Sequence, residues 1–343
     1  MNFHKSKNYQ IDMTNGSIVG KLIRFSGPLI FSGILQLLFN AADIVVVGRF
    51  AGDNSLAAVG STSSLINLLV NLFVGLSVGT NVVAANYFGA GKKNELSKTV
   101  HTAILLSIYS GIILTIVGVI GAKQILRLMQ SPEEVLVKAT LYLQIYFGGI
   151  TATMVYNFGS ALLRAKGDTQ RPLYILLFAG IINVVLNLIF VVFFKMDVAG
   201  VALATVISQT ISAILVVFCL MKEEDEFKLN IKKLKMDRDI FIRIVKIGVP
   251  AGFQGIMFSF SNVIIQSSVN SFGAITIAGN SAASNLVGFV YVAMNGFAQG
   301  TLTFTSQNAG AAKYQRVRKV VIASEVIVMV IGLILGNLMY LCG

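Results

Sequence analysis

Charged residues are scarce in this 343-residue chain and make up only 12% of it. Hydrophobic residues make up 55%, and the mean hydropathy is +0.78. A soluble globular domain has about twice that share of charged residues, because its surface faces water. The composition therefore excludes a soluble protein and predicts an integral membrane protein.

Residue types that commonly carry catalysis or bind metals are also few. The two cysteines, Cys219 and Cys342, lie near the ends of apolar segments and cannot make a disulfide framework. The two histidines have no metal-ligand partners at a useful spacing, and no pair of nucleophile and base stands out. The stretches at 16–21 and 89–92 have the wrong spacing for a nucleotide-phosphate loop. We therefore expect a protein that is not an enzyme, has no cofactor and draws any energy from an ion gradient.

The net charge of +12 could indicate nucleic-acid binding, but the positions of the basic residues favour another explanation. Nine apolar runs are long enough to span the ~30 Å hydrocarbon core. They lie at 22–48, 56–88, 100–122, 134–163, 173–194, 198–221, 241–272, 276–309 and 318–341. When the 27 basic residues are assigned to alternate sides, 22 fall on the side of the N-terminus, which the positive-inside rule makes cytoplasmic. We expect a multi-pass protein in contact with lipid, with no removable signal peptide and no nucleic-acid partner.

The sequence from Lys21 to Val100 recurs weakly from Arg243 to Val321. At an offset of 222, Pro28, Gly33, Asn40, Val47 and Phe50 fall on Pro250, Gly255, Asn262, Val269 and Phe272, and after a one-residue slip the pair Gly75 and Gly79 falls on Gly296 and Gly300. So long a period does not fit a solenoid, but it fits the duplicated architecture of secondary transporters. Six runs precede the second copy, so the copies are expected to be parallel repeats.

This duplication predicts three segments. They are an N-terminal lobe of six helices at 1–221, a cytoplasmic connector at 222–246 and a partial C-terminal lobe of three helices at 247–343. The connector has four consecutive acidic residues followed by lysines, which is typical of a solvated segment. A second copy as long as the first would need ~100 further residues, as parallel repeats are of similar size. The expected fold class is an all-α membrane protein of two six-helix repeats, the second incomplete, with about nine spans.

Two acidic residues, Asp43 and Glu325, lie inside apolar runs, where a carboxylate is costly and by default functional. Asp43 is the stronger candidate, because Gln36 and Asn40 share its helix face. Such a face can offer oxygens to a cation such as Na⁺, or hold a carboxyl group that exchanges protons. A structural Asp43 paired with Arg49 is the alternative.

Further polar residues inside apolar runs need partners in lipid. Asn183 and Asn187 lie one turn apart, and Thr205 lies in the next run; polar contacts between helices would also explain each of them. A second stripe, without charge, consists of Gln254, Asn262, Gln266 and Asn270. Because the two stripes lie in equivalent runs, they predict a central polar cavity between the lobes.

Pro28 and Pro250 lie near the starts of equivalent runs. In a first helical turn a proline is tolerated, whereas further inside a helix it produces a bend that can act as a hinge. The GxxxG pairs at 75–79 and 296–300 indicate that backbones approach closely.

Several stretches resemble the multidrug and toxic compound extrusion (MATE) family, specifically its bacterial DinF-like branch. They are GPLIFSGILQLLFNAADIVVVGRFAG, GTNVVAANYFGAGKKNE, LLRAKGDTQRP, INVVLNLIF and GVALATVISQ, within a likeness that runs from about Gly20 to the C-terminus. The resemblance implies a two-lobe antiporter of the bacterial inner membrane, a monomer that exports amphipathic, often cationic compounds in exchange for Na⁺ or H⁺. It places the ion site at Asp43, with Gln36, Asn183, Asn187 and Thr205 around it, and it makes Pro28 a helix bend.

The chain departs from the family pattern in three places. The position of Asn187 often carries Asp in the family, and Phe39 stands where an aromatic hydroxyl can accompany the site. No acid occurs in the run at 241–272, where other branches have one, so coupling would depend on the first lobe. Two alternatives stay open at this point: a lipid or lipid-linked sugar flippase of the same superfamily, and a membrane fragment that does not transport.

Overall fold

Nearly all described residues are helical, which confirms the predicted all-α fold class. The computed structural model describes residues 9–129, 132–270 and 274–342. The α-helices in these ranges are α1 (Ile18–Phe50), α2 (Asp53–Gly89), α3 (Lys93–Leu128), α4 (Glu133–Gly148), α5 (Ile150–Lys166), α6 (Gln170–Asn187), α7 (Asp197–Met221), α8 (Arg238–Asn270), α9 (Ala274–Gly310) and α10 (Tyr314–Cys342). A π-helix, η2 (Leu188–Phe193), continues α6, and a 3₁₀-helix, η3 (Ile231–Lys233), precedes α8. A helix satisfies its backbone N–H and C=O groups internally, which hydrocarbon surroundings demand.

Among the described residues, seven helices are long and apolar enough to cross a membrane, or eight if α4 and α5 form one span. These two helices meet at Gly149 with a bend of 47°. The predicted count of nine spans is therefore not confirmed. The difference concerns the run at 276–309, because its helix α9 contains many Ser, Thr, Asn and Gln residues that lower its hydropathy.

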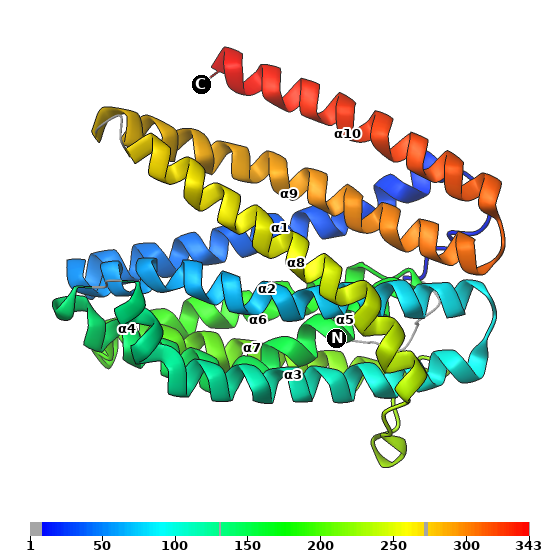
Figure 1. The fold of residues 1–343 in the computed structure, drawn as a ribbon, viewed down its shortest axis with the longest axis horizontal. Helices are drawn as coiled ribbons and strands as arrows, with labels where there is room; N and C mark the ends of the chain where they lie inside the picture. The colour runs from blue at the N-terminus through cyan, green and yellow to red at the C-terminus, as the bar shows by residue number, and fades with distance from the viewer. Residues whose placement is uncertain (1–8, 130–131, 271–273, 343) are drawn as a thin grey trace.

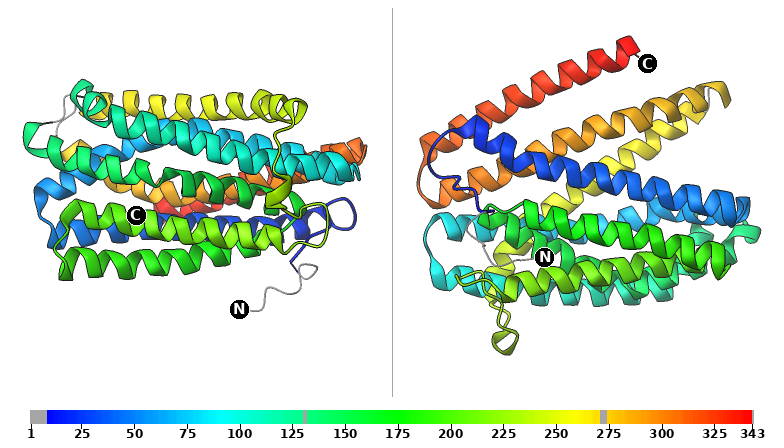
Figure 2. Two further views of the ribbon diagram at one scale, coloured as in Figure 1. Left: turned by 90° about the horizontal axis from the view of Figure 1, so that it is seen from below. Right: turned by 180° about the vertical axis from the view of Figure 1, so that it is seen from behind.

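The long helices run between two ends of the molecule (Figures 1 and 2). At one end the helices lie close together, and at the other end they diverge. The α2–α3, α5–α6 and α9–α10 turns lie at the end where the parts meet, which we call the closed end. At the opposite, open end, α8 and α9 diverge from α1 and α2. Beyond Phe253, α8 is exposed on most sides: Phe253, Met257, Phe258, Phe260, Ile264 and Ile265 are 50–59% exposed.

The two halves of α1 pack in different cores. Leu22 and Phe25 are fully buried in a core shared with α9 and α10, whereas Val46 and Val47 lie in a core formed with α2, α3, α4, α5 and α7. Pro28 lies between these halves and well inside the helix. It is therefore an interior proline, which removes a backbone hydrogen bond and favours a bend, rather than a first-turn proline.

The helix α8 shows the reciprocal arrangement. Its first part buries Ile240 and Ile244 in a core with α2, α3, α5, α6 and α7. Beyond Pro250, which is also inside the helix, α8 leaves that core and runs toward the open end near α9. Pro28 thus lies where α1 passes from one core to another, and Pro250 lies where α8 leaves its core.

The helices α2 and α8 cross through glycines. A β-carbon on Gly75 would lie 2.3 Å from the backbone nitrogen of Gly252, and one on Gly79 would lie 2.4 Å from the carbonyl oxygen of Ile244. Gly248 is equally restricted from the side of α8. No side chain fits at this crossing, so the close backbone approach that the GxxxG pair predicts is confirmed here.

The segment after α7, which the sequence predicts to be solvated, is instead partly buried. Phe227 and Leu229 are buried in the core that contains the first part of α8. Asp237 accepts a hydrogen bond from the backbone N–H of Ile240 and pairs with Lys98 at 3.1 Å, and these contacts hold the pKa of Asp237 below its usual range. The apolar residues between the charges therefore dock this segment, although its overall composition is polar.

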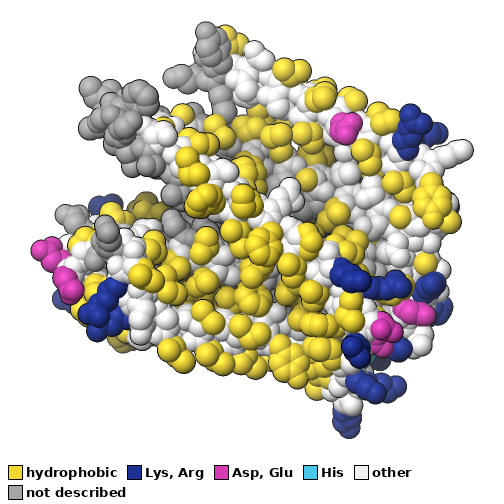
Figure 3. All heavy atoms as spheres, viewed as in Figure 1, with side chains coloured by type: hydrophobic (Ala, Val, Ile, Leu, Met, Phe, Trp, Pro, Cys, Tyr) yellow, Lys and Arg dark blue, Asp and Glu magenta, His cyan; other side chains and the backbone are white. Residues whose placement is uncertain are grey.

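The surface is divided in the way that a bilayer requires. On the face shown in Figure 3, charged side chains gather toward the two ends, and the surface between them is mainly hydrophobic. Large apolar side chains of α3 such as Ile113, Ile116 and Ile120 are at least half exposed. Such side chains are stable in contact with lipid, which places the membrane around the middle of the helices.

Replacing Gly75 with alanine is expected to force α2 away from α8, because the new methyl group would meet only backbone atoms. The free energy of unfolding should fall by about 1–3 kcal/mol, the usual range for overpacking. Gly60 of α2 is the matched control, since a β-carbon there meets nothing within 4 Å and Gly60→Ala removes a helix-interior glycine. Thermal unfolding in detergent measures both variants, and equal losses would contradict the role of the crossing.

Candidate functional site

Asp43 of α1 lies against α6, and a chain of polar side chains connects it to α7. The amide nitrogen Nδ2 of Asn187 donates a hydrogen bond to Oδ1 of Asp43. The same nitrogen lies 3.4 Å from Oδ1 of Asn183, and Nδ2 of Asn183 donates to Oγ1 of Thr205 at 3.4 Å. Four residues singled out in the sequence thus meet from three helices, and we call them the Asp43 cluster.

The helices position these side chains in a simple way. Asn183 and Asn187 are one turn apart on α6 and are 6% and 1% exposed. The hydroxyl of Thr205 donates to the carbonyl oxygen of Val201 at 3.0 Å, which leaves an oxygen lone pair to accept from Asn183. The π-helix η2 begins directly after Asn187, and π-helical turns are frequent at functional sites.

A close contact between α1 and α6 sets the width of the cluster. A β-carbon on Gly180 would lie 1.9 Å from the ring of Phe39, so only glycine admits this ring. Phe39 precedes Asp43 by one helical turn, and Gly180 precedes Asn187 by two. The missing side chain at 180 therefore lets α1 approach α6 closely enough for Asn187 to reach Asp43.

The cluster is rich in hydrogen-bond acceptors. Asp43 is half-buried, and Oδ1 of Asn187 is buried without a hydrogen-bond partner among the described residues. Carboxylate, amide and hydroxyl oxygens are the ligands of hard cations, and a carboxyl group among them can instead bind a proton.

Gln36 and Asn40 do not join the cluster in this structure. Their side chains are exposed, and no described hydrogen bond links them to it. The stripe of Ser26, Ile30 and Gly33 on α1 faces α9. Gln36 and Asn40 continue that stripe toward the open end, so they lie on the side of α1 that faces the diverging α9.

The polar stripe of α8 is only partly described. Gln254 and Asn262 are exposed, and Asn262 continues the glycine stripe that faces α2. The side chains of Gln266 and Asn270 lie outside the described part of the structure. Uncharged polar side chains are thus found on both α1 and α8 where these helices diverge.

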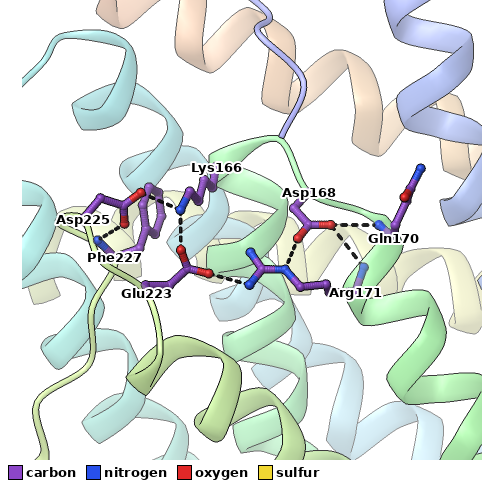
Figure 4. A network of polar contacts seen from close by, with 7 residues as sticks. All are labelled: Lys166, Asp168, Gln170, Arg171, Glu223, Asp225 and Phe227. Carbon is purple, nitrogen blue, oxygen red and sulfur yellow. Dashed lines mark hydrogen bonds and ion pairs between the residues drawn. The ribbon is translucent and has the colours of Figure 1, made fainter. Parts of the chain in front are cut away.

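A second buried polar group, which the sequence analysis did not single out, lies at the closed end (Figure 4). Glu223 contacts both Lys166 and Arg171, with 2.5 Å between its Oε1 and Nη1 of Arg171. Lys166 also lies 2.5 Å from Asp225, and Arg171 pairs with Asp168. The side chains of Lys166, Asp168, Arg171 and Glu223 are at most 4% exposed. We call these five residues the closed-end ion network; it joins the α5–α6 turn to the segment after α7.

Comparison with known proteins gives a family match in two blocks. The chain matches the MatE family over residues 28–189 and 250–343, and the first block contains Asp43 and Asn187. The probable multidrug resistance protein YoeA of Bacillus subtilis (strain 168) is 28% identical over 324 residues, which cover 92% of this chain and 70% of that protein. The multidrug export protein MepA of Staphylococcus aureus (strain N315) is 25% identical over 319 residues, which cover 91% and 70%.

Solved structures share the same fold. A transporter of the MOP superfamily from Pyrococcus furiosus has a TM-score of 0.89 at 24% identity, over 96% of this chain and 74% of that one. A multidrug resistance MATE family transporter in an outward-facing conformation has a TM-score of 0.89 at 23% identity, with the same coverage. At these identities the likeness establishes the fold alone.

The contact between Asp43 and Asn187 is expected to appear as an energetic coupling. Asp43→Leu or Asn187→Leu alone removes one partner of this hydrogen bond and leaves the other behind, whereas the double variant removes both. The double variant should therefore be less destabilised than the sum of the single variants, by about 1–3 kcal/mol. Unfolding free energies in mixed micelles measure this, and a cycle of Asn187→Leu with Glu325→Leu, an exposed acid on α10, is the control. Additive effects for the first pair would contradict the contact.

Proposed function

Because the chain belongs to the MatE family of membrane transporters, we propose that it is an antiporter that exports small amphipathic, mainly cationic compounds in exchange for Na⁺ or H⁺. Membership of the family makes it a multi-pass membrane transporter of small compounds and not an enzyme. The names of two relatives refer to multidrug resistance and multidrug export. The exchanged cation and the chemical class of the compounds are what we propose here.

The observation that carries the proposal is the Asp43 cluster. A half-buried carboxylate inside a membrane helix is costly, and such residues therefore mark ion or substrate pathways. The amide nitrogen of Asn187 donates a hydrogen bond to the carboxylate. The buried Oδ1 of Asn187 has no partner among the described residues, as expected of an oxygen that binds a cation. Together with Asn183 and Thr205, these oxygens suit Na⁺ coordination, and protonation of Asp43 would neutralise the same site.

Coupling requires that the cation favours one conformation over the other. The helix α1 provides a physical link, since it carries Asp43 in one half and the closed-end residues Leu22 and Phe25 in the other. Pro28 lies between these halves. We propose that neutralising Asp43 changes how the part of α1 after Pro28 packs on α6. The bend at Pro28 would transmit this change to the closed end.

The diverging parts of the molecule suit amphipathic cations. No Lys or Arg occurs between Arg24 and Arg49, within α2, or between Lys246 and Lys313. Uncharged polar side chains are exposed there, and the exposed rings of Phe258 and Tyr291 stack with their centroids 5.3 Å apart. Aromatic faces attract cations, whereas a flippase for phosphate-bearing lipids would need basic residues in this region.

We also propose that the closed end faces the cytoplasm. Its turns and the segment after α7 carry most of the basic residues, whereas the open end has Arg49, Lys123, Arg127, Lys138 and Lys195. By the positive-inside rule the N-terminus is then cytoplasmic, in the bacterial inner membrane. We also propose that the protein is a monomer of two lobes joined by the connector at 222–246. It would use the transported cation and no cofactor.

Asp43→Asn is expected to abolish gradient-driven efflux while the protein still inserts in the membrane, because the amide cannot change charge. The measurement is export of a fluorescent cationic dye from proteoliposomes with an imposed Na⁺ or H⁺ gradient. Glu325→Gln is the matched control, since it removes an acid that is exposed on α10. Efflux by Asp43→Asn at the wild-type rate would refute this role of Asp43.

Asn187→Asp is expected to raise the affinity for Na⁺, because a hard cation gains from each added carboxylate. Two carboxylates beside each other also repel, so the variant should be less stable without the cation and gain more from adding it. Thermal unfolding as a function of Na⁺ concentration measures this gain. Flat or weaker stabilisation would indicate that Asn187 does not contribute to a cation site.

A further inference from the structure

The α5–α6 turn, at 165–171, is the place where four segments of the closed end meet. It contacts α9, the chain before α1 and the segment after α7, and Oγ1 of Thr169 donates to the carbonyl oxygen of Phe25 of α1 at 3.1 Å. We propose that this turn is a latch that holds the closed end shut: the carbonyl oxygens of Ala165 and Gly167 receive hydrogen bonds from segments that must leave for this end to open. The inference concerns conformation and does not depend on which cation or compound is exchanged.

The contact with α9 is a buried amide-to-backbone hydrogen bond. Nε2 of Gln307 donates to the carbonyl oxygen of Ala165 at 2.7 Å, and Gln307 is only 1% exposed. Nearby, Oγ1 of Thr303 donates to Oδ1 of Asn81 at 3.0 Å, and a β-carbon on Gly89 would lie 2.0 Å from the carbonyl oxygen of Gln307. The α9 backbone is thus seated directly on α2 and α5, with little space for water between them.

The second contact involves the residues before α1, which we call the N-terminal strap (residues 9–17). The backbone N–H of Ile11 donates to the carbonyl oxygen of Gly167 at 3.1 Å. Gly167 has φ +104°, and a β-carbon there would lie 2.5 Å from the carbonyl oxygen of Ile11. Only glycine therefore both adopts this conformation and lets the strap lie against the turn.

The other part of the strap is fixed to α9 and α10. Met13 is fully buried, and its carbonyl oxygen accepts from Nδ2 of Asn308 and Nε of Arg316, each at 3.1 Å. Lys313 donates to the carbonyl oxygen of Thr14 at 3.0 Å and to Oδ1 of Asn15 at 2.9 Å. The strap therefore bridges from the α5–α6 turn to the α9–α10 turn, between two parts of the molecule that diverge at the open end.

The closed-end ion network explains why the turn can serve as the fixed side of the latch. Lys166, Asp168 and Arg171 are turn residues, and their partners Glu223 and Asp225 follow α7 (Figure 4). None of these ion pairs crosses to α9, α10 or the strap. Separation of the closed end would therefore break the bonds to Ala165 and Gly167 but leave the network intact, so the turn keeps its shape for closing again.

Two variants test the latch in the full chain. Gly167→Ala displaces the strap, and Gln307→Leu removes the bond to Ala165. Gly91→Ala is the control for the first, because Gly91 also has a left-handed conformation, at φ +66°, but a β-carbon there meets nothing within 4 Å. Gln315→Leu is the control for the second, because Gln315 is an exposed glutamine of the closed end.

The conformation is read from maleimide labelling in phospholipid nanodiscs, with Cys219 and Cys342 replaced by alanine. One reporter is Ser306→Cys, at a buried α9 position of the closed end, and the other is Asn40→Cys, at an exposed α1 position toward the open end. Loss of one neutral hydrogen bond should raise the labelling rate of Ser306→Cys about fivefold, because the population in which the closed end has separated rises by that factor.

The two latch variants should thus accelerate labelling at 306 while labelling at 40 stays unchanged or slows, and the two controls should change neither. An unchanged rate at 306 in both latch variants would overturn the proposal. Equal acceleration in the controls would also overturn it, as would acceleration at both reporters, because that result indicates general loosening rather than a shift toward the open state of this end.

Discussion

The rest of the structure depends on the lack of hydrogen-bonding solvent inside a membrane. Backbone groups satisfy this constraint by forming helices, and polar side chains satisfy it by meeting one another across helices. Asp43, Asn183, Asn187 and Thr205 meet for this reason: each lies in an apolar stretch of its helix, and the contacts of Asp43 with Asn187 and of Asn183 with Thr205 cross from one helix to the next. The same constraint makes the remaining buried oxygen of Asn187 informative, because an unpaired acceptor there is costly unless something else binds it.

The packing at the closed end couples parts of the chain that are far apart in sequence. The first part of α1 packs in a core with α9 and α10 and its second part in a core with α2, α3, α4, α5 and α7, and Pro28 lies between the two parts. A helix shared in this way cannot shift in one core without affecting the other. This packing supports the proposal that a charge change at Asp43 reaches the closed end through α1 itself.

Several of these features could be predicted from residues alone, and others could not. The apolar runs and the carboxylate at Asp43 were visible because hydropathy and charge are local properties. The burial of Phe227 and Leu229 was not visible, because the charges around them dominate any average over the segment. The exposure of Gln36 was missed for a related reason: its spacing from Asp43 places both residues on one face, but the divergence of α9 decides what covers each part of that face.

The sequence by itself determined that this is a helical membrane protein with duplicated segments, a carboxylate in its first helix and few basic residues within its apolar runs. These properties follow from composition and period, which need no knowledge of contacts. Only the tertiary structure decided that Asn187 donates to Asp43, that Gly180 gives Phe39 room, and that the turn at 165–171 meets the strap, α9 and the ion network. The contacts of Asp43, of Gly180 and of the turn with the strap and α9 join residues more than 100 positions apart. Their geometry depends on how whole helices cross rather than on any local pattern.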